Sequence, residues 1–199
     1  MPDRTTPRRS RLREWLPTLA LLGLMVVARS SLANHYVVPS GSMQPTLEPG
    51  DRVLVDMSAY GLRLPFTGTV LLARARPARG DVVVLPSPRD GTRLIKRVVA
   101  VAGDRVSVRG GHLAIDGVPA ARGAGIERIG ARDVPVNLSH GGGPDVEVVV
   151  PAGHVLVVGD NRGNSFDGRS FGFAREASIY ARARGVYWRR GERFTWKAL

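Results

Sequence analysis

The run Val38-Pro39-Ser40-Gly41-Ser42-Met43-Gln44-Pro45-Thr46-Leu47-Glu48-Pro49-Gly50-Asp51 is the stretch around which the rest of the chain is organised. Its prolines restrict φ and remove backbone donors, while its glycines let the backbone approach a ligand closely. The run therefore predicts a rigid, shaped loop on which a serine nucleophile could be mounted. A plain linker turn has the same composition, so that alternative stays open at this point.

An arginine-rich segment lies N-terminal to this loop and leads into an apolar run over residues 15–28. A basic flank before an apolar run is typical of membrane insertion with the N-terminus in the cytoplasm. We expect a basic cytoplasmic segment over 1–14, a membrane anchor helix over 15–35 and an extracytoplasmic domain over 36–199.

One residue, Arg29, interrupts the apolar run, so a crossing requires its side chain to snorkel to the outer interface. The competing hypothesis is a secretory signal peptide that is cut after Ala33. We favour a retained anchor, because Ala33 lies only nine positions before Ser42 and leaves no room for a mature N-terminal element.

Short runs rich in Val, Leu and Ile follow the loop, separated by Gly and Pro, and predict strands. In chain order we expect them at 52–56, 69–73, 81–85, 93–101, 146–150, 154–158, 178–188 and 192–196. A hairpin is predicted around Gly110-Gly111, because two consecutive glycines supply the positive φ values of a tight turn. The glycine-rich residues 118–145 predict an exposed excursion. The expected fold is mainly β, an antiparallel β-sheet body behind one N-terminal transmembrane helix.

The amino-acid composition argues against several classes of function. The chain has 199 residues, 43% of them hydrophobic, which is enough for one sizeable core. The net charge is +12, but the basic residues are not interleaved with aromatics in one stripe, which argues against a nucleic-acid partner. There is no cysteine, and the four histidines have no metal-ligand spacing. We expect neither a metal nor another cofactor.

Lys96 is the most informative single residue. Of the 29 Lys and Arg residues only Lys96 and Lys197 are lysine, so arginine is the usual cation of this chain. Lys96 lies inside the apolar run Leu94-Ile95-Lys96-Arg97-Val98-Val99, where desolvation can lower its pKa and make it a base. A Ser with a Lys base is a known variant of the serine-hydrolase arrangement. The alternative is a lysine at the edge of a strand whose side chain faces water and has no catalytic role.

A third dense stretch, Gly159-Asp160-Asn161-Arg162-Gly163-Asn164-Ser165-Phe166-Asp167-Gly168-Arg169, follows a predicted strand. Its composition predicts a tightly hydrogen-bonded turn. A polar surface loop is the plain alternative. A calcium loop is disfavoured, because the distant glutamate that closes an EF-hand is missing.

These stretches, taken in order, resemble the bacterial type I signal (leader) peptidases, a family of Ser-Lys dyad serine proteases. The resemblance rests on the loop at 39–47, on Arg79-Gly80-Asp81-Val82-Val83-Val84 with Ile95-Lys96-Arg97, and on the stretch 159–169. It covers roughly residues 15 to 190. Gly163 and Gly168 depart from the family pattern, which often has an acidic residue and a serine there.

The resemblance implies a role for each matching residue. Ser42 would be the nucleophile, Lys96 the general base, and Ser165 the group that orients the lysine amine. Ser40 and the Ser42 backbone N–H would form the oxyanion hole. The family's structural ion pair near the site matches Asp167 and Arg169, and its shallow substrate subsites, which give the Ala-X-Ala preference, match Tyr36, Val38, Met43, Leu47, Val53, Val84 and Ile95.

The resemblance also implies partners and a location. The partners would be the signal peptides of exported preproteins, the lipid bilayer and the export translocon. The catalytic domain of this single-pass protein would lie on the extracytoplasmic side of the cytoplasmic membrane. Two alternatives remain: a maturation peptidase of the same family dedicated to few substrates, as in conjugation or pilus assembly, and a non-catalytic anchored β module that binds exported proteins.

Overall fold

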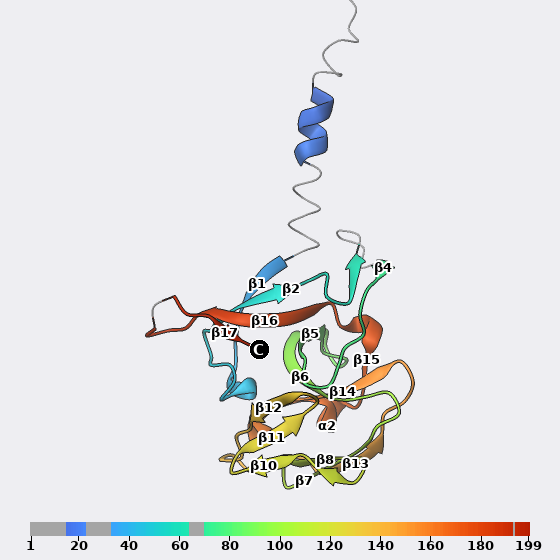
Figure 1. The fold of residues 1–199 in the computed structure, drawn as a ribbon, viewed down its shortest axis with the longest axis vertical. Coiled ribbons are helices and arrows are strands. Elements are labelled where there is room, and N and C mark those ends of the chain that lie inside the picture. Colours follow the sequence, from blue (N-terminus) through green and yellow to red (C-terminus); the bar gives the residue numbers. More distant parts are fainter. Residues whose placement is uncertain (1–14, 23–32, 64–69, 193) are drawn as a thin grey trace, which may run out of the picture.

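The computed structural model describes residues 15–22, 33–63, 70–192 and 194–199. Within these residues every strand ladder is antiparallel, so the expectation of a mainly antiparallel β fold is confirmed. The strands form four sheets with only short helical turns between them (Figure 1).

The largest sheet has eight strands in the order β1-β2-β16-β5-β6-β14-β15, and β17 also pairs with β16. Its strands are β1 (Ala33–Val37), β2 (Arg52–Asp56), β5 (Val82–Pro86), β6 (Arg93–Val101), β14 (His154–Val158), β15 (Ala174–Arg175), β16 (Ala181–Trp188) and β17 (Lys197–Ala198). The central strands β5, β6 and β14 are buried Val-rich runs, which suits strands covered on both faces.

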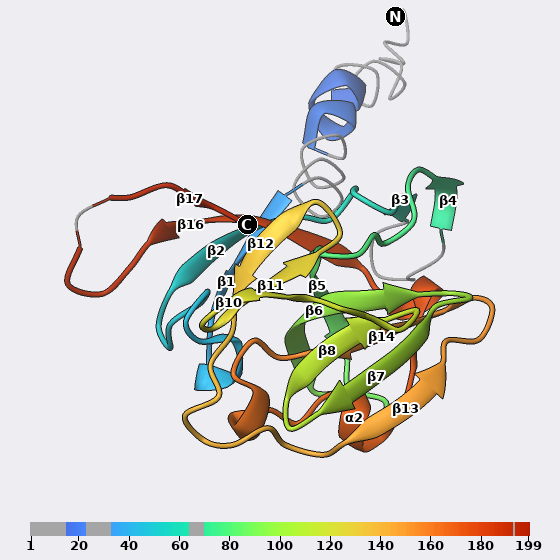
Figure 2. The same ribbon diagram turned by 60° about the horizontal axis from the view of Figure 1, so that its bottom comes forward.

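Three smaller sheets complete the body. They comprise β13 (Val146–Val149), β7 (Arg105–Arg109), β8 (His112–Ile115) and β9 (Val118–Pro119); β10 (Ala121–Gly123), β11 (Ile126–Ile129) and β12 (Arg132–Pro135); and β3 (Gly61–Arg63) with β4 (Val70–Ala73). The helical turns are η1 (Gly41–Met43), η2 (Arg162–Asn164), α2 (Gly168–Phe171) and η3 (Glu176–Ser178). In Figure 2, β7, β8 and β13 lie across the front of the body.

The hairpin predicted around Gly110-Gly111 is confirmed. β7 and β8 pair in the expected register, with Val106 opposite Ile115 and Val108 opposite Leu113. Both turn glycines have positive φ, 53° and 84°, which is the conformation that a two-residue turn of this kind requires.

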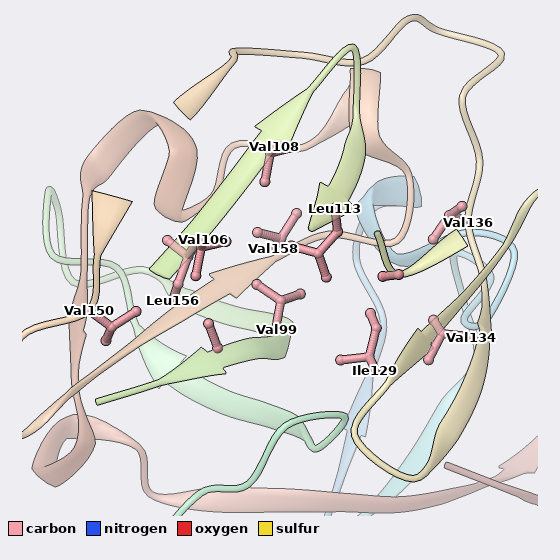
Figure 3. Close-up of a cluster of buried hydrophobic side chains, with 12 residues drawn as sticks. Val99, Val106, Val108, Leu113, Ile129, Val134, Val136, Val150, Leu156 and Val158 are labelled. Atoms are coloured by element: carbon pink, nitrogen blue, oxygen red, sulfur yellow. The ribbon is translucent and has the colours of Figure 1, made fainter. Parts of the chain in front are cut away.

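The segment 118–145 is exposed over much of its length, as expected, but some of its side chains belong to the core. Its strands β11 and β12 bury Ile129 and Val134 in a hydrophobic cluster beneath the β7–β8 hairpin. In Figure 3, the side chains of Val106, Leu113 and Val158 point toward one another from three different strands of this cluster. Residues 118–145 are therefore part of the folded body, because burying their apolar side chains stabilises the sheet against which they pack.

Two other expectations need correction at their boundaries. The last strands begin later than predicted: β16 starts at Ala181 after the η3 turn, and β17 covers only Lys197–Ala198 instead of 192–196. At the N-terminal side, residues 33–35 of the predicted anchor helix lie in β1, which pairs with β2.

Residues 15–22 are helical, and Trp15, Leu16 and Leu19 are exposed apolar side chains there. The rest of the predicted anchor up to residue 32 lies outside the described residues. Among the helices that the structure describes, none has both the length and the hydrophobicity needed to cross a bilayer.

Candidate active site

The candidate nucleophile Ser42 lies in the short turn η1, between the edge strand β1 and strand β2. The turn is closed by hydrogen bonds from Gln44 N to Gly41 O (3.1 Å) and from Leu47 N to Met43 O (2.9 Å). Met43 and Leu47 are fully buried, so two apolar anchors on its C-terminal side fix the turn to the core. The loop that the prolines and glycines predict to be rigid is thus held both by backbone hydrogen bonds and by the packing of Met43 and Leu47.

Strand β6 brings Lys96 to this turn. Its Nζ donates a 2.5 Å hydrogen bond to the Oγ of Ser42, a residue 54 positions away in the chain. Lys96 is only 3% exposed. Desolvation by burial lowers the pKa of Lys96 to about 8, although the carboxylates of Asp167 and Asp160 oppose this change. The neutral form of this amine, next to a hydroxyl, can accept its proton.

Ser40 is exposed and lies beside the proposed nucleophile, its Oγ donating to the Ser42 Oγ at 3.4 Å. Its backbone is extended, with φ −143° and ψ 161°, immediately before η1. The Ser40 hydroxyl is therefore near enough to meet a substrate oxygen bound over Ser42.

Ser165 lies against the same turn, but it makes no hydrogen bond to Lys96 among the described residues. A Cβ built on Gly159 would lie 2.2 Å from the Ser165 Oγ and 2.5 Å from the Ser42 carbonyl oxygen, so both groups meet over this glycine. The Oγ is close enough to Asp167 to help lower the pKa of that carboxyl, yet it is buried without a well-formed hydrogen bond to a described group.

Asp167 and Arg169 form a fully buried ion pair, with Arg169 Nη2 2.8 Å from Asp167 Oδ2. Burial alone would raise the pKa of Asp167, but hydrogen bonding to Arg169 and the Arg169 charge outweigh it and lower this pKa. The Asp167 carboxylate also caps α2 and accepts from Gly159 N at 2.9 Å. The pair thus fixes the loop that carries Ser165.

Sequence reasoning assigned no role to a second buried network behind the nucleophile. Arg97, the neighbour of Lys96, makes two hydrogen bonds to the Asp160 carboxylate, at 2.9 and 2.7 Å. The Thr46 hydroxyl donates to the same carboxylate at 2.6 Å. The sequence did contain a sign of this network. Arg97 follows Lys96 in a strand predicted to be buried, and a buried arginine needs a carboxylate partner.

No role was predicted from the sequence for Asn161 either. Its backbone N–H donates to the Ser42 carbonyl and its side-chain amide donates to the Gly41 carbonyl, both at 3.1 Å. The loop 159–169 therefore holds the backbone of η1 directly.

The predicted substrate residues separate into two groups. Four of them line one cavity of about 230 Å³ beside the dyad: Tyr36, Val38, Val84 and Ile95, together with Val37, Pro39, Arg93 and Leu94. The other three, Met43, Leu47 and Val53, are 0% exposed and pack in the hydrophobic cluster behind the cavity. As the structure stands, these three support the cavity wall and do not form its surface.

The chain matches the family described as "Signal peptidase, peptidase S26" over residues 12–188. It is similar to a signal peptidase I of Pseudomonas fluorescens, with 36% identity over 167 residues that cover 75% of this chain and 59% of that protein. The chain therefore spans less than two thirds of that relative's length.

A signal peptidase I of Leptolyngbya laminosa is 31% identical over 180 residues, which cover 90% of this chain and 81% of that protein. The crystal structure of a signal peptidase I from Enterococcus faecalis V583 aligns with a TM-score of 0.41 and 29% identity, covering 54% of this chain and 96% of that chain.

Proposed function

This chain belongs to the signal peptidase family S26, and from this premise we propose that it is a membrane-anchored serine endopeptidase that removes signal peptides from exported preproteins. The observation that carries the proposal is the 2.5 Å contact between the Lys96 Nζ and the Ser42 Oγ in a buried site. A hydroxyl needs a base within hydrogen-bond reach to attack a carbonyl, and this amine meets that requirement.

In the first step the Ser42 Oγ attacks the scissile carbonyl carbon while its proton passes to the neutral Lys96 amine. With a pKa of about 8, roughly a tenth of the lysine is neutral at pH 7. The oxyanion that forms would accept hydrogen bonds from the Ser42 backbone N–H and the Ser40 hydroxyl. Fixed donors of this kind contribute about 3 kcal/mol each to transition-state stabilisation.

In the second step the tetrahedral species collapses, the C–N bond breaks, and the Lys96 ammonium returns its proton to the leaving amine. This leaves an ester between the substrate acyl group and Ser42. A water molecule then attacks the ester, its proton passing to Lys96, and the released Ser42 oxygen recovers a proton. Ser165 would orient the amine through this cycle, and its buried Oγ, which has no well-formed bond to a described group, is available for that contact.

The substrate would bind as an extended strand. β1 is an edge strand of the large sheet, and β14 pairs with β6 only from Arg97 onward. In the described part of the chain, no strand therefore pairs with the 93–96 segment on its β14 side. Extended peptides bind to such unpaired edges through main-chain hydrogen bonds. The apolar cavity beside these edges is suited to small side chains, which supports Ala-X-Ala selection.

The membrane part of the proposal rests on the sequence alone. A basic segment followed by the apolar run 15–28 supports an anchor that leaves the catalytic body on the extracytoplasmic side. The lipid bilayer and the export translocon are the partners that this arrangement implies.

The test compares the wild type with S42A and K96R, using a purified preprotein with a cleavable signal peptide and mass spectrometry of the products. Arginine keeps the charge but cannot act as a base, so we expect both variants to lose at least about a hundredfold in rate. K197R, the same change at the other lysine, which is exposed in β17, is the control and should cleave normally. Normal cleavage by K96R contradicts the proposal, and binding without cleavage by the wild type would leave an anchored binding module.

A further inference from the structure

The cavity beside the dyad has one charged residue among the described residues that line it, and that residue is Arg93. The remaining wall is formed by uncharged side chains such as Val38, Val84 and Ile95. Among the described residues, Arg93 is therefore the charge that a side chain bound in this cavity would meet.

Arg93 is held in place by aromatic rings. Its guanidinium lies 4.3 Å from the centre of the Tyr36 ring, within the range of a cation–π contact. Tyr180 adjoins both side chains. Burial raises the pKa of Tyr180 to about 12, Tyr36 adds to the rise and the Arg93 charge opposes it. Tyr180 is therefore a neutral neighbour at physiological pH.

The Arg93 charge is also uncompensated. Among the described residues it forms no ion pair, whereas Arg97, in the buried middle of the same strand, is paired with Asp160. Arg93 itself is exposed, so its guanidinium can be reached by a ligand in the cavity. A carboxylate that entered the cavity would meet a positioned cation without having to break an existing ion pair.

The distance from the dyad defines which substrate residue Arg93 would meet. Arg93 precedes Lys96 by three residues on the same strand, which corresponds to about 10 Å at 3.3 Å per residue. The Ala-X-Ala residues that would fill this cavity lie before the cleaved bond, and Arg93 lines the same cavity. The fourth residue before the bond is three residues from the one at the dyad, so it would present its side chain near Arg93.

We propose that Arg93 is a specificity-determining residue that favours signal peptides with an acidic side chain at the fourth residue before the cleaved bond and disfavours basic ones there. The inference rests on the proposed function, since it concerns the same site and the same reaction. An exposed charge pair contributes little, so the preference for Glu over Lys should be about tenfold in kcat/KM at low salt.

The experiment uses the full-length protein in detergent and peptides that span an Ala-X-Ala cleavage site, with Glu, Gln or Lys introduced as the fourth residue before the cleaved bond. For the wild type we expect the order Glu, Gln, Lys, with a ratio that shrinks as salt increases. R93Q should bring the Glu-to-Lys ratio close to one, and R93E should reverse it. R105A, which removes an exposed arginine from β7 in another sheet, should keep the wild-type ratio.

The outcomes separate the two proposals. If the wild type cleaves none of the peptides, the proposed function fails. If it cleaves them all with the same kcat/KM, or if R93E keeps the wild-type order, the enzyme stands and the role of Arg93 is refuted. Reversal of the order by R93E cannot come from misfolding, because a damaged protein would lose activity toward every peptide alike.

Discussion

Lys96 and Arg97 are consecutive residues of β6 whose side chains reach opposite ends of the same loop. Lys96 contacts Ser42, while Arg97 binds the Asp160 carboxylate that also receives the Thr46 hydroxyl. Successive side chains of a strand point to opposite faces, so one strand can supply a base on one side and an anchor on the other. The position of the base is therefore tied to the position of the nucleophile.

The first prediction concerns the pH dependence of cleavage. Burial lowers the pKa of Lys96 to about 8, and only the neutral amine can accept the serine proton. Activity should therefore be low near pH 6, rise about tenfold per pH unit and level off above pH 8. A pH profile of kcat/KM measures this directly, and a profile that is flat between pH 6 and 9 would contradict the assignment of the base.

The second prediction is that Lys96 destabilises the fold at neutral pH. Its folded pKa of about 8 lies below the ordinary 10.5, so below pH 8 folding must bury an ammonium at a cost on the order of 3 kcal/mol. K96M should raise the free energy of unfolding at pH 7. The gain should decline as pH rises from 8 to 10.5, since the lysine is then increasingly neutral in both states. Urea titrations at several pH values measure it, and a gain independent of pH would refute the assigned shift.

The third prediction concerns Gly159. A methyl group there would lie 2.5 Å from the Ser42 carbonyl oxygen and 2.2 Å from the Ser165 Oγ, so G159A must displace the nucleophile turn, the loop 159–169 or both. Because small misplacements of reacting groups have large effects, we expect at least a hundredfold loss of kcat.

Gly103 supplies the control for G159A. It has a φ of +93° and open space around its Cβ position, so G103A introduces backbone strain on the order of 1 kcal/mol without a clash. G103A should lower the unfolding free energy and keep kcat. Equal activities of the two variants would show that the close approach at Gly159 is unimportant.

The fourth prediction concerns Ser165. If its hydroxyl orients the Lys96 amine in the substrate complex, S165A removes about one hydrogen bond, and kcat should fall about tenfold with little change in KM. S170A, which removes an exposed hydroxyl five residues further on, is the matched control and should have no effect. A change confined to KM would assign Ser165 to substrate binding instead.

The fifth prediction concerns the ion pair between Glu127 on β11 and Arg162 on η2, whose side chains are each 1% exposed and 2.5 Å apart. E127Q leaves the Arg162 charge buried without a carboxylate, which typically costs about 3 to 5 kcal/mol of unfolding free energy. E147Q breaks the exposed pair with Arg109 and should cost less than about 1 kcal/mol. Urea denaturation compares the two, and equal losses would contradict the importance of burial.

The local features of the fold were predictable from the sequence. The β7–β8 hairpin follows from two glycines between two runs of alternating apolar residues, and β6 follows from an apolar run that Lys96 and Arg97 interrupt. Even Lys96 could be singled out, because a lysine in an arginine-rich chain and an apolar strand is chemically unusual. These signals are local, so no knowledge of distant partners was needed.

Other features depend on partners far away in the chain. Glu127 points inward from β11 because Arg162, 35 positions further on, meets it there, and the strand pattern alone cannot reveal this. Likewise Val53 and Val84 are both valines in strands, but only Val84 reaches the cavity. Hydrophobicity indicates that a side chain is buried, whereas the packing of the whole body decides whether it can touch a ligand.

The hydrogen bond from the Asn161 side chain to the Gly41 carbonyl joins residues 120 positions apart. A chain that has been synthesised only as far as β14 contains Ser42 and Lys96 but lacks the loop that fixes the backbone around the serine. Contacts of such long range also form late, after distant strands have found each other. Hydrolytic competence would thus arrive only after the loop 159–169 has been synthesised, so an activity assay also reports complete folding.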